Sequence, residues 1–273
     1  MRLTLIIGPT EKAAARLRNI MGQKREALAA QGVLAPEWNH VRLYAACAEP
    51  EAVGLLRYRR GLDSALVGAT LREELAATIA RDLEGTGADH VVMAAAQLGN
   101  LLSAPAELTR LRDLLSVHFD DIRIVAHLDE QARLLAAHYA FAVTEGRRHP
   151  LSRELSLAEG GDWWDATRAM AATEDAPDVG LFRDIQAPPF WLDYAALHAH
   201  WARVFGAENV SFRPLDAAFL ASAEGAAELD ALLALHRPLG PVKPGRVIGP
   251  IPAPWLERMR RFNEVLIRYL QVK

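Results

Sequence analysis

Short apolar runs that alternate with helical patterns are the feature of this sequence that most restricts its fold. Four such runs, rich in β-branched residues, are expected to be strands, and they cover residues 3–7, 90–94, 122–127 and 209–213. Strands with continuous apolar character are usually buried on both faces, as they are in parallel sheets covered by helices. The alternation of such strands with helices therefore predicts an α/β fold, a three-layer sandwich with a mostly parallel sheet.

The expected helices fill most of the chain between these strands. Apolar residues recur at helical spacing over residues 11–30, 65–83, 104–117, 129–144, 190–205, 225–236 and 255–271. Residues 145–190 differ, because Gly, Pro, Asp and Trp are dense there and predict loops around short helices. Such an insertion forms a lid over an acceptor or a structural loop subdomain, and both interpretations stay open. We expect one domain over residues 1–273 that carries this insertion.

Charge and cysteine content exclude several kinds of site. The chain has 31 Lys and Arg against 34 Asp and Glu, a formal charge of −3, so a large basic face for nucleic acid is not indicated. The single cysteine, Cys47, allows neither an intramolecular disulfide nor a zinc cluster built on thiolates. No run of 18 apolar residues occurs, and the first apolar run is too short for a signal peptide. We therefore expect a cytoplasmic protein with no metal, nucleic-acid or membrane site.

The first strand leads into a turn and a helix in the way a phosphate-binding loop begins. The stretch LTLIIGPTEKAAARL, residues 3–17, passes from an apolar strand through Gly8 and Pro9 into a helix almost at once. A glycine at a strand end lets backbone N–H groups and the first helical turn face an anion. The scaffold of a nucleotide site is therefore present, and the residues that follow decide whether it can work.

Several stretches, in order along the chain, resemble the bacterial sulfotransferase family. They are IIGPTEKAAARL with NIMGQKREALAAQGVLAP near the start, IRIVAHLDEQARLLAAHYAFAVTEG at 122–146, LDYAALHAHWARVFGAENVSFRPLD at 192–216, and RRFN at 260–263. Members of that family bind 3′-phosphoadenosine 5′-phosphosulfate (PAPS) on a P-loop-like α/β fold. The resemblance implies this fold, and it implies transfer of a sulfuryl group from PAPS to a hydroxyl of a carbohydrate or small metabolite.

The loop residues that hold the phosphosulfate in the family do not carry over. Aligned on Gly8 and Pro9, the sequence places Glu11 at the lysine that supports the transferring group and Lys12 at a threonine. Ala13 falls at the glycine, and the following alanines fall at the paired hydroxyls. A carboxylate repels an anionic nucleotide, and alanine offers no hydroxyl donor. The degenerate pocket thus comprises Gly8, Pro9, Thr10, Lys12 and Ala13.

The other two anchor points that the resemblance implies are also changed. Asp129 stands at the arginine and Ala137 at the serine that bind the 3′-phosphate, so the guanidinium and hydroxyl that match its oxygens are missing. Gln97 stands where many relatives have the glutamate that takes the acceptor's proton, and an amide cannot act as that base.

Two functional hypotheses follow. In the first, the protein is a catalytically silent relative that binds no cofactor and serves as a binding or assembly module, with a protein partner or a homo-oligomer. In the second, it is a divergent sulfotransferase that uses PAPS and an unidentified small-molecule or carbohydrate acceptor. Lys12, if the loop is re-registered by one residue, and His127, as a strand-end base, are then the alternative catalytic residues.

Basic and aromatic residues elsewhere give further candidates. The resemblance suggests that Lys243 and Arg246, in a Pro/Gly-rich loop, contact the nucleotide phosphate, while the alternative is that they are solvated loop charges. Arginines in two short clusters are further candidates for an anion: Arg57, Arg59, Arg60, Arg147 and Arg148. Three tryptophans in the insertion or beside it line an acceptor pocket or plug the lid: Trp163, Trp164 and Trp191.

Overall fold

The computed structural model describes residues 1–38, 40–64, 66–172, 176–245 and 249–271. The chain forms two compact units, each assembled from three separate segments. The first unit contains residues 1–49, 65–129 and 198–247, and the second contains residues 50–64, 130–197 and 248–273. The expectation of one domain over residues 1–273 stays a prediction. Within the described residues, no helix has the length and apolar character that a membrane crossing requires.

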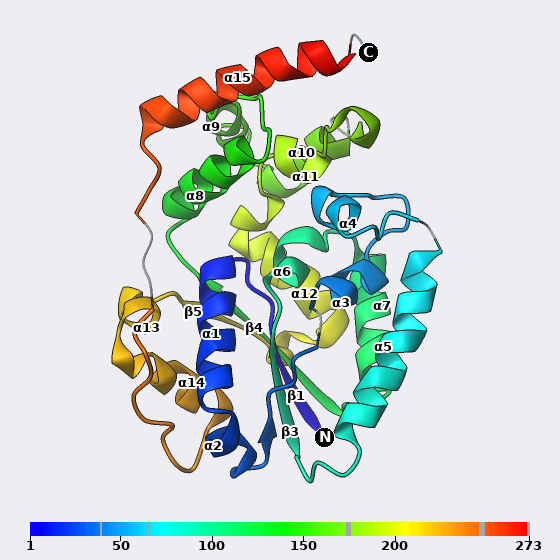
Figure 1. Cartoon of the computed structure of the whole chain (residues 1–273), viewed down its shortest axis with the longest axis vertical. Coiled ribbons are helices and arrows are strands. Elements are labelled where there is room, and N and C mark those ends of the chain that lie inside the picture. The colour runs from blue at the N-terminus through cyan, green and yellow to red at the C-terminus, as the bar shows by residue number, and fades with distance from the viewer. Residues whose placement is uncertain (39, 65, 173–175, 246–248, 272–273) are drawn as a thin grey trace. The chain divides into compact units, whose positions relative to one another are not determined.

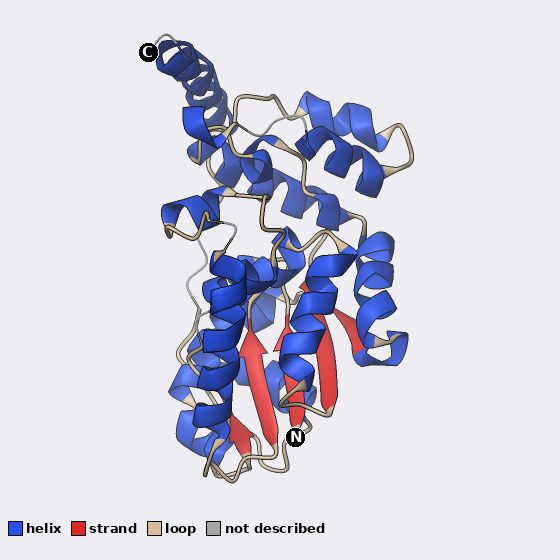
Figure 2. Ribbon diagram, turned by 90° about the vertical axis from the view of Figure 1, so that its right-hand side faces the viewer, coloured by secondary structure: helices blue, strands red, loops and turns tan. Residues whose placement is uncertain are grey.

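The first unit is built on a five-stranded sheet in which every neighbouring pair of strands is parallel. The strand order is β2-β3-β1-β4-β5, and the strands are β1 (Arg2–Ile6), β2 (Val33–Leu34), β3 (His90–Ala94), β4 (Asp121–Leu128) and β5 (Val210–Pro214). Helices lie on both sides of this sheet (Figures 1 and 2). The predicted α/β fold with a mostly parallel sheet is confirmed.

One face of the sheet packs against helices from both ends of the chain. These helices are α1 (Glu11–Gln23), α2 (Arg25–Ala29), α13 (Ala217–Ala221) and α14 (Ala226–Leu233). Because side chains alternate along a strand, Ile6, Val92 and Val125 share this face and meet the apolar side of α1. Leu17 and Ile20 of α1 are completely buried in this cluster.

The opposite face is covered by helices that connect the middle strands. They are α3 (His40–Cys47), α5 (Val67–Leu83), α6 (Ala96–Leu101) and α7 (Pro105–Ser116), and α3 contacts each of the other three. α12 (Tyr194–Phe205) brings the fully buried Trp201, which stacks on Phe205 with ring centroids 5.6 Å apart. The central strands β1 and β3 are therefore buried over most of their length, which explains why they read as continuous apolar runs.

The second unit is helical in its described part. It contains α4 (Leu55–Arg59), α8 (Gln131–Thr144), α9 (Ser152–Ala158), α10 (Trp163–Ala172), α11 (Arg183–Gln186) and α15 (Ala253–Gln271), with 3₁₀ turns at Pro177–Val179 and Phe190–Leu192. The loop-rich insertion predicted at about 145–190 lies inside this unit, and short helices occupy much of it. Small apolar clusters among its described residues stabilise this unit. One contains Leu55, Ala142, Phe182 and Ile185, and another contains Tyr139, Val143 and Leu256.

Buried arginines replace part of the apolar core in the second unit. Arg57 donates to the carbonyl oxygens of Leu62, Ala52 and Pro50, at 2.9, 3.0 and 3.3 Å. Arg147 is fully buried, lies 2.5 Å from the Glu154 carboxylate and covers the ring of Tyr139. The contacts of these two guanidinium groups are therefore made within the protein, so neither group requires an external anion as a partner. Arg59 is similarly paired with Glu145 at 2.5 Å.

Candidate functional site

The loop after β1 is closely packed rather than open. Gly8 has φ +86°, and a Cβ there would lie 2.8 Å from Cα of Ala96 in α6. Gly99, one turn further along α6, donates its backbone N–H to the Ile7 carbonyl at 2.9 Å, and a Cβ on Gly99 would lie 2.3 Å from that oxygen. Both contacts need glycine, because any side chain would displace backbone atoms. The loop therefore rests directly on α6.

The N-terminus of α1 is satisfied by the protein's own groups. The Thr10 hydroxyl accepts the backbone N–H of Ala13 at 3.4 Å and is buried in doing so. Glu11 occupies the first turn, where a carboxylate interacts favourably with the helix dipole. Its carboxylate pairs with Arg18, and Arg18 also donates to the Ala94 carbonyl at the end of β3, at 3.0 Å. Glu11 thus lies in the first turn of α1, and its carboxylate is directed along the helix to Arg18.

Lys12 and Ala13 differ sharply in exposure. Ala13 is almost fully buried against the sheet, whereas Lys12 is exposed on α1. The alanine at residue 14 is also buried, so this part of the helix is core rather than loop. Small side chains at these positions let α1 approach β3, with which it is in contact.

The remaining predicted anchor residues lie in both units. Asp129 follows β4 at the end of a segment of the first unit, and it is partly buried. Ala137 is exposed on α8 in the second unit. Gln97 lies in α6, and its side-chain oxygen is enclosed with no hydrogen-bond donor from the part of the chain that the structure describes.

His127 belongs to a polar cluster at the carboxyl end of β4. The side chain is only 1% exposed, and its Nε2 lies 2.9 Å from Oε1 of Glu228 in α14. Arg213, the residue of β5 in register with His127, donates to both oxygens of the same carboxylate, at 2.5 and 3.1 Å. Phe219 stacks on the imidazole with ring centroids 5.6 Å apart and an interplanar angle of 15°.

Electrostatics in this cluster favour the ionised carboxylate. Burial by itself raises the pKa of Glu228, but the hydrogen bonds and charges of His127 and Arg213 outweigh it and lower that pKa to about 2. Nε2 faces Glu228, and the other ring nitrogen of His127 takes no part in this contact. That atom, Nδ1, is enclosed and has no hydrogen-bond partner among the described residues.

Sequence reasoning selected His127 but missed its two partners. Arg213 follows from the sheet alone, since parallel strands β4 and β5 place it directly beside His127. Glu228 carries no local signal, because it is one of many glutamates on a helix surface until the fold brings α14 to the sheet.

The backbone of Lys243 is fixed beside α1. Its N–H donates to the Gln23 side chain at 2.9 Å, and its carbonyl accepts from Arg16 at 2.7 Å. Arg16 also holds the carbonyls of Ser222 and Phe219, at 2.8 and 3.3 Å. Gln23 is twelve residues after Glu11 on the same helix, or about 18 Å along its axis. Lys243 is therefore anchored toward the far end of α1, while Arg246 lies outside the described residues.

The tryptophans of the insertion make packing contacts within the second unit. Trp163 donates its indole N–H to the Pro189 carbonyl at 2.8 Å, and Trp164 meets Phe190 edge-on with centroids 4.9 Å apart. Trp191 is buried against His138. All three contacts lie within the second unit, and the choice between an acceptor pocket and a plug stays a prediction.

Cysteine and metal chemistry find no support among the described residues. Burial raises the pKa of the Cys47 thiol to about 12, so this thiol stays protonated at neutral pH. No group of three or more His, Cys, Asp and Glu side chains in the described segments is arranged to hold a metal ion.

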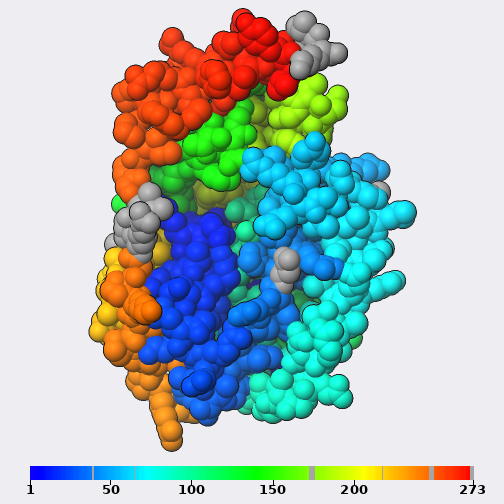
Figure 3. Space-filling view, viewed as in Figure 1, coloured from blue at the N-terminus to red at the C-terminus, as the bar shows by residue number. Residues whose placement is uncertain are grey.

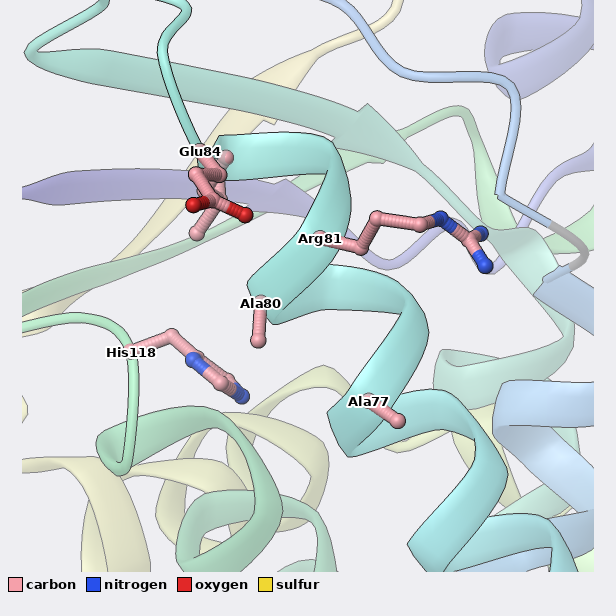
Figure 4. A pocket seen from close by; sticks show the side chains of 6 residues that line it. Ala77, Ala80, Arg81, Glu84 and His118 are labelled. Atoms are coloured by element: carbon pink, nitrogen blue, oxygen red, sulfur yellow. The ribbon is translucent and has the colours of Figure 1, made fainter.

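A shallow groove in the first unit lies away from these residues. It is lined by Ala77, Ala80, Arg81, Leu83, Glu84 and His118, at the C-terminal end of α5 and after α7 (Figure 4). These segments lead into the amino ends of β3 and β4. In open α/β sheets ligands bind at the carboxyl ends of the strands, so this groove is on the wrong edge for the site implied by the fold.

Comparison with known proteins gives one informative similarity. No protein-family model matches the chain, and no curated protein matches it. Among solved structures, the crystal structure of a sulfotransferase from Alicyclobacillus acidocaldarius superimposes with a TM-score of 0.55, over 98% of this chain and 94% of the other. The two sequences are 14% identical. The chain therefore has a sulfotransferase-like fold along nearly its whole length.

Proposed function

We propose that this protein is a catalytically silent relative of sulfotransferases, which keeps the fold as a binding or assembly module and does not bind PAPS in the manner of that family. The observation that carries the proposal is the N-terminus of α1. Thr10 caps this helix, and Glu11 lies in its first turn with Arg18 as its partner.

The ion pair between Glu11 and Arg18 refines the electrostatic argument. An isolated carboxylate would simply repel a phosphosulfate, whereas here Arg18 largely compensates its charge. The same pair, however, takes the nearby guanidinium out of use, because its N–H groups point at Glu11 and at the Ala94 carbonyl. A nucleotide at this helix N-terminus would find a carboxylate in the first turn and alanines where the family has hydroxyls.

A second function, that of a divergent sulfotransferase acting on a hydroxyl of a carbohydrate or small metabolite, is favoured by one observation. The Glu228 carboxylate contacts Nε2 of His127, and Nδ1 has no hydrogen-bond partner among the described residues, which is how a carboxylate prepares a histidine to accept a proton. Burial opposes this role, since an acceptor reaches Nδ1 only if neighbouring side chains move. We therefore give His127 a structural role in the main proposal.

Calorimetry with 3′,5′-adenosine bisphosphate, the nucleotide product of sulfuryl transfer, tests the choice. The silent relative gives no binding heat, whatever the acceptor is. Binding in the micromolar range or tighter would overturn the proposal and support the divergent enzyme.

Variants make the result informative in either direction. The double change Glu11→Lys and Asp129→Arg restores the family's charges and is expected to create nucleotide binding. Glu11→Lys with the exposed Glu26→Arg has the same change in net charge but restores only one anchor, and it serves as the matched control. If the wild-type protein binds and Lys12→Ala abolishes that binding, the loop is re-registered and Lys12 is functional.

A further inference from the structure

The C-terminal helix α15 has two apolar faces, and the described part of the chain covers one of them. Leu256 and Ile267 are buried, Arg260 donates to the Arg148 carbonyl at 2.8 Å, and Asn263 donates to the carbonyls of Val143 and Arg147 at 2.9 Å. These residues share one side of the helix and attach it to its own unit. A helix that is apolar over more than one face is usually buried on each of them.

The second face carries six large apolar side chains in contact with solvent. Their exposed fractions range from 40% for Trp255 to 72% for Tyr269. We call this set the α15 stripe, and its members are Trp255, Phe262, Val265, Leu266, Tyr269 and Leu270. In the space-filling view α15, orange to red, forms part of the outer surface of its unit (Figure 3).

The spacing of the three aromatic residues makes the stripe continuous. Trp255, Phe262 and Tyr269 are spaced seven residues apart. Seven residues make almost two full helical turns, so each aromatic side chain is rotated by only about 20° about the helix axis relative to the one before. The aromatic rings therefore lie in a line along α15. Isolated exposed apolar residues need no explanation, but a line of six on one helix is typical of an interaction site.

Charges around the stripe indicate a protein partner. Glu257 pairs with Arg260 and Arg261, and Glu264 pairs with Arg260, so both glutamates are engaged on the polar side. The charged residue that helical geometry places within the stripe is Arg258. Aromatic residues together with arginine are the composition enriched in protein–protein interfaces, which are depleted in lysine and in carboxylates.

We propose that the α15 stripe is the interface of a homodimer in which two α15 helices pair antiparallel, with the two-fold axis beside Phe262. In this arrangement Phe262 meets Phe262 of the second copy, and Trp255 faces Tyr269, because both pairs are symmetric about residue 262. Arg258 then faces Leu266 of the second copy. The two Arg258 residues of the dimer lie about 12 Å apart along the helix axis. A parallel pair would instead place Arg258 of one copy directly against Arg258 of the other. Repulsion between these like charges opposes that arrangement.

The exposed area of the stripe agrees with a weak, reversible dimer. Six side chains of this size and exposure present on the order of 500 Å² per copy. Two copies together would bury about 1,000 Å², which is where specific protein interfaces begin. We therefore expect the monomer–dimer equilibrium to depend visibly on protein concentration.

Sedimentation velocity over a wide range of concentration tests the dimer. The wild-type protein should move from the monomer mass toward twice that mass, and Phe262→Arg should remain monomeric at every concentration. Phe141→Arg is the matched control, since Phe141 of α8 is 55% exposed against 56% for Phe262 and lies outside the stripe. Circular dichroism of each variant establishes that it is folded.

Charge pairing and cross-linking test the position of the axis. Phe262→Arg and Phe262→Glu should each be monomeric alone and should associate when mixed, because the axis places opposite charges together. Phe262→Cys should form a disulfide-linked dimer on oxidation, whereas Tyr269→Cys should not. Cross-linking of Tyr269→Cys alone would overturn the antiparallel arrangement, and the native Cys47 is buried and does not interfere.

Two results would overturn the proposal as a whole. One is a wild-type protein that stays monomeric at all concentrations, and the other is a dimer that survives Phe262→Arg. Co-sedimentation of the monomer with vesicles of anionic phospholipid, lost in Phe262→Arg, would assign the stripe to a membrane surface instead.

Discussion

Single residues in this protein take their roles from partners that the fold supplies. Glu11 illustrates this point, because its charge was visible in the sequence as a mismatch with a phosphate site, but its pairing with Arg18 was not. The two residues share a face of α1, being seven positions apart, and only the packed structure shows that Arg18 also reaches Ala94. What sequence predicts well at this scale is the type of residue at a position, and what it misses is the partner.

Glu228 leads to a prediction about acid stability. Its pKa lies at about 2 in the folded protein, against an ordinary value of 4.5, so the folded state binds the proton less tightly than the unfolded state does. The stabilisation is therefore fully present above about pH 4.5 and is lost as the pH falls toward about 2. We expect Glu228→Gln to reduce the free energy of unfolding at neutral pH by about 2 kcal/mol.

Denaturant unfolding measured from neutral to acid pH checks this expectation. The wild-type protein should lose more stability than Glu228→Gln over the window from about pH 4.5 to about pH 2. The control is Glu26→Gln, which changes an exposed glutamate of α2 and should leave the pH dependence as it is. Parallel curves for wild type and Glu228→Gln would contradict the assignment of the shift to this cluster.

At the scale of elements, the sequence predicted the helices that are amphipathic and the strands that are continuously apolar. All four expected strands are present within one residue of their predicted ends. β1 and β3 are buried almost throughout, so they form uniform apolar runs that are easily recognised. α3 was missed for the opposite reason: Val41, Leu43, Tyr44 and their neighbours are buried around most of the helix, so no periodic polar face marks it. β2 is only two residues long and has no pattern of its own.

The break between α1 and α2 was also missed. The expected helix over residues 11–30 divides at Lys24, whose φ and ψ of −112° and 16° are not helical. The break itself is neither glycine nor proline, and the nearby Gly22 still lies within α1. Lys24 donates its backbone N–H to the Ile20 carbonyl as α1 ends. The helical spacing of apolar residues continues across the break, since Leu28 lies in the same core cluster as Leu17. The spacing of apolar residues therefore could not reveal the break.

α6 provides a prediction about the loop after β1. Gly99→Ala would place a Cβ 2.3 Å from the Ile7 carbonyl oxygen, so the helix or the loop has to shift. We expect this variant to lose about 1–3 kcal/mol of stability. Gly22→Ala in α1 is the matched control, because no atom of the described residues lies within 4 Å of the added Cβ, and it should gain up to about 1 kcal/mol. Chemical denaturation of both variants distinguishes them, and a Gly99→Ala protein as stable as wild type would mean that α6 does not support the loop.

The whole molecule consists of two units that could not be read from the sequence. One boundary, between residues 247 and 248, falls in a Pro/Gly-rich stretch, but composition does not show that each unit collects three segments that are distant in the chain. In the second unit, residues 50–64 are attached to the insertion through Asp184, which accepts the Leu55 N–H at 3.2 Å. Such a side-chain contact between distant segments leaves no trace in composition, whereas the density of Gly, Pro and Trp over 145–190 did mark the region as different.

Hydrogen exchange should reveal the two units as separate cooperative bodies. Asn263→Ala removes the donor to the Val143 and Arg147 carbonyls, and we expect faster exchange in α15 and at the end of α8, with β1, β3 and β4 unchanged. Asn209→Ala is the reciprocal variant in the first unit, where the side chain donates to the Phe205 carbonyl at 2.9 Å. It should speed exchange near the end of α12 and leave α15 unchanged. Mass spectrometry of peptides from both units decides the matter, because faster exchange in both units after either change would mean that the protein opens as one body.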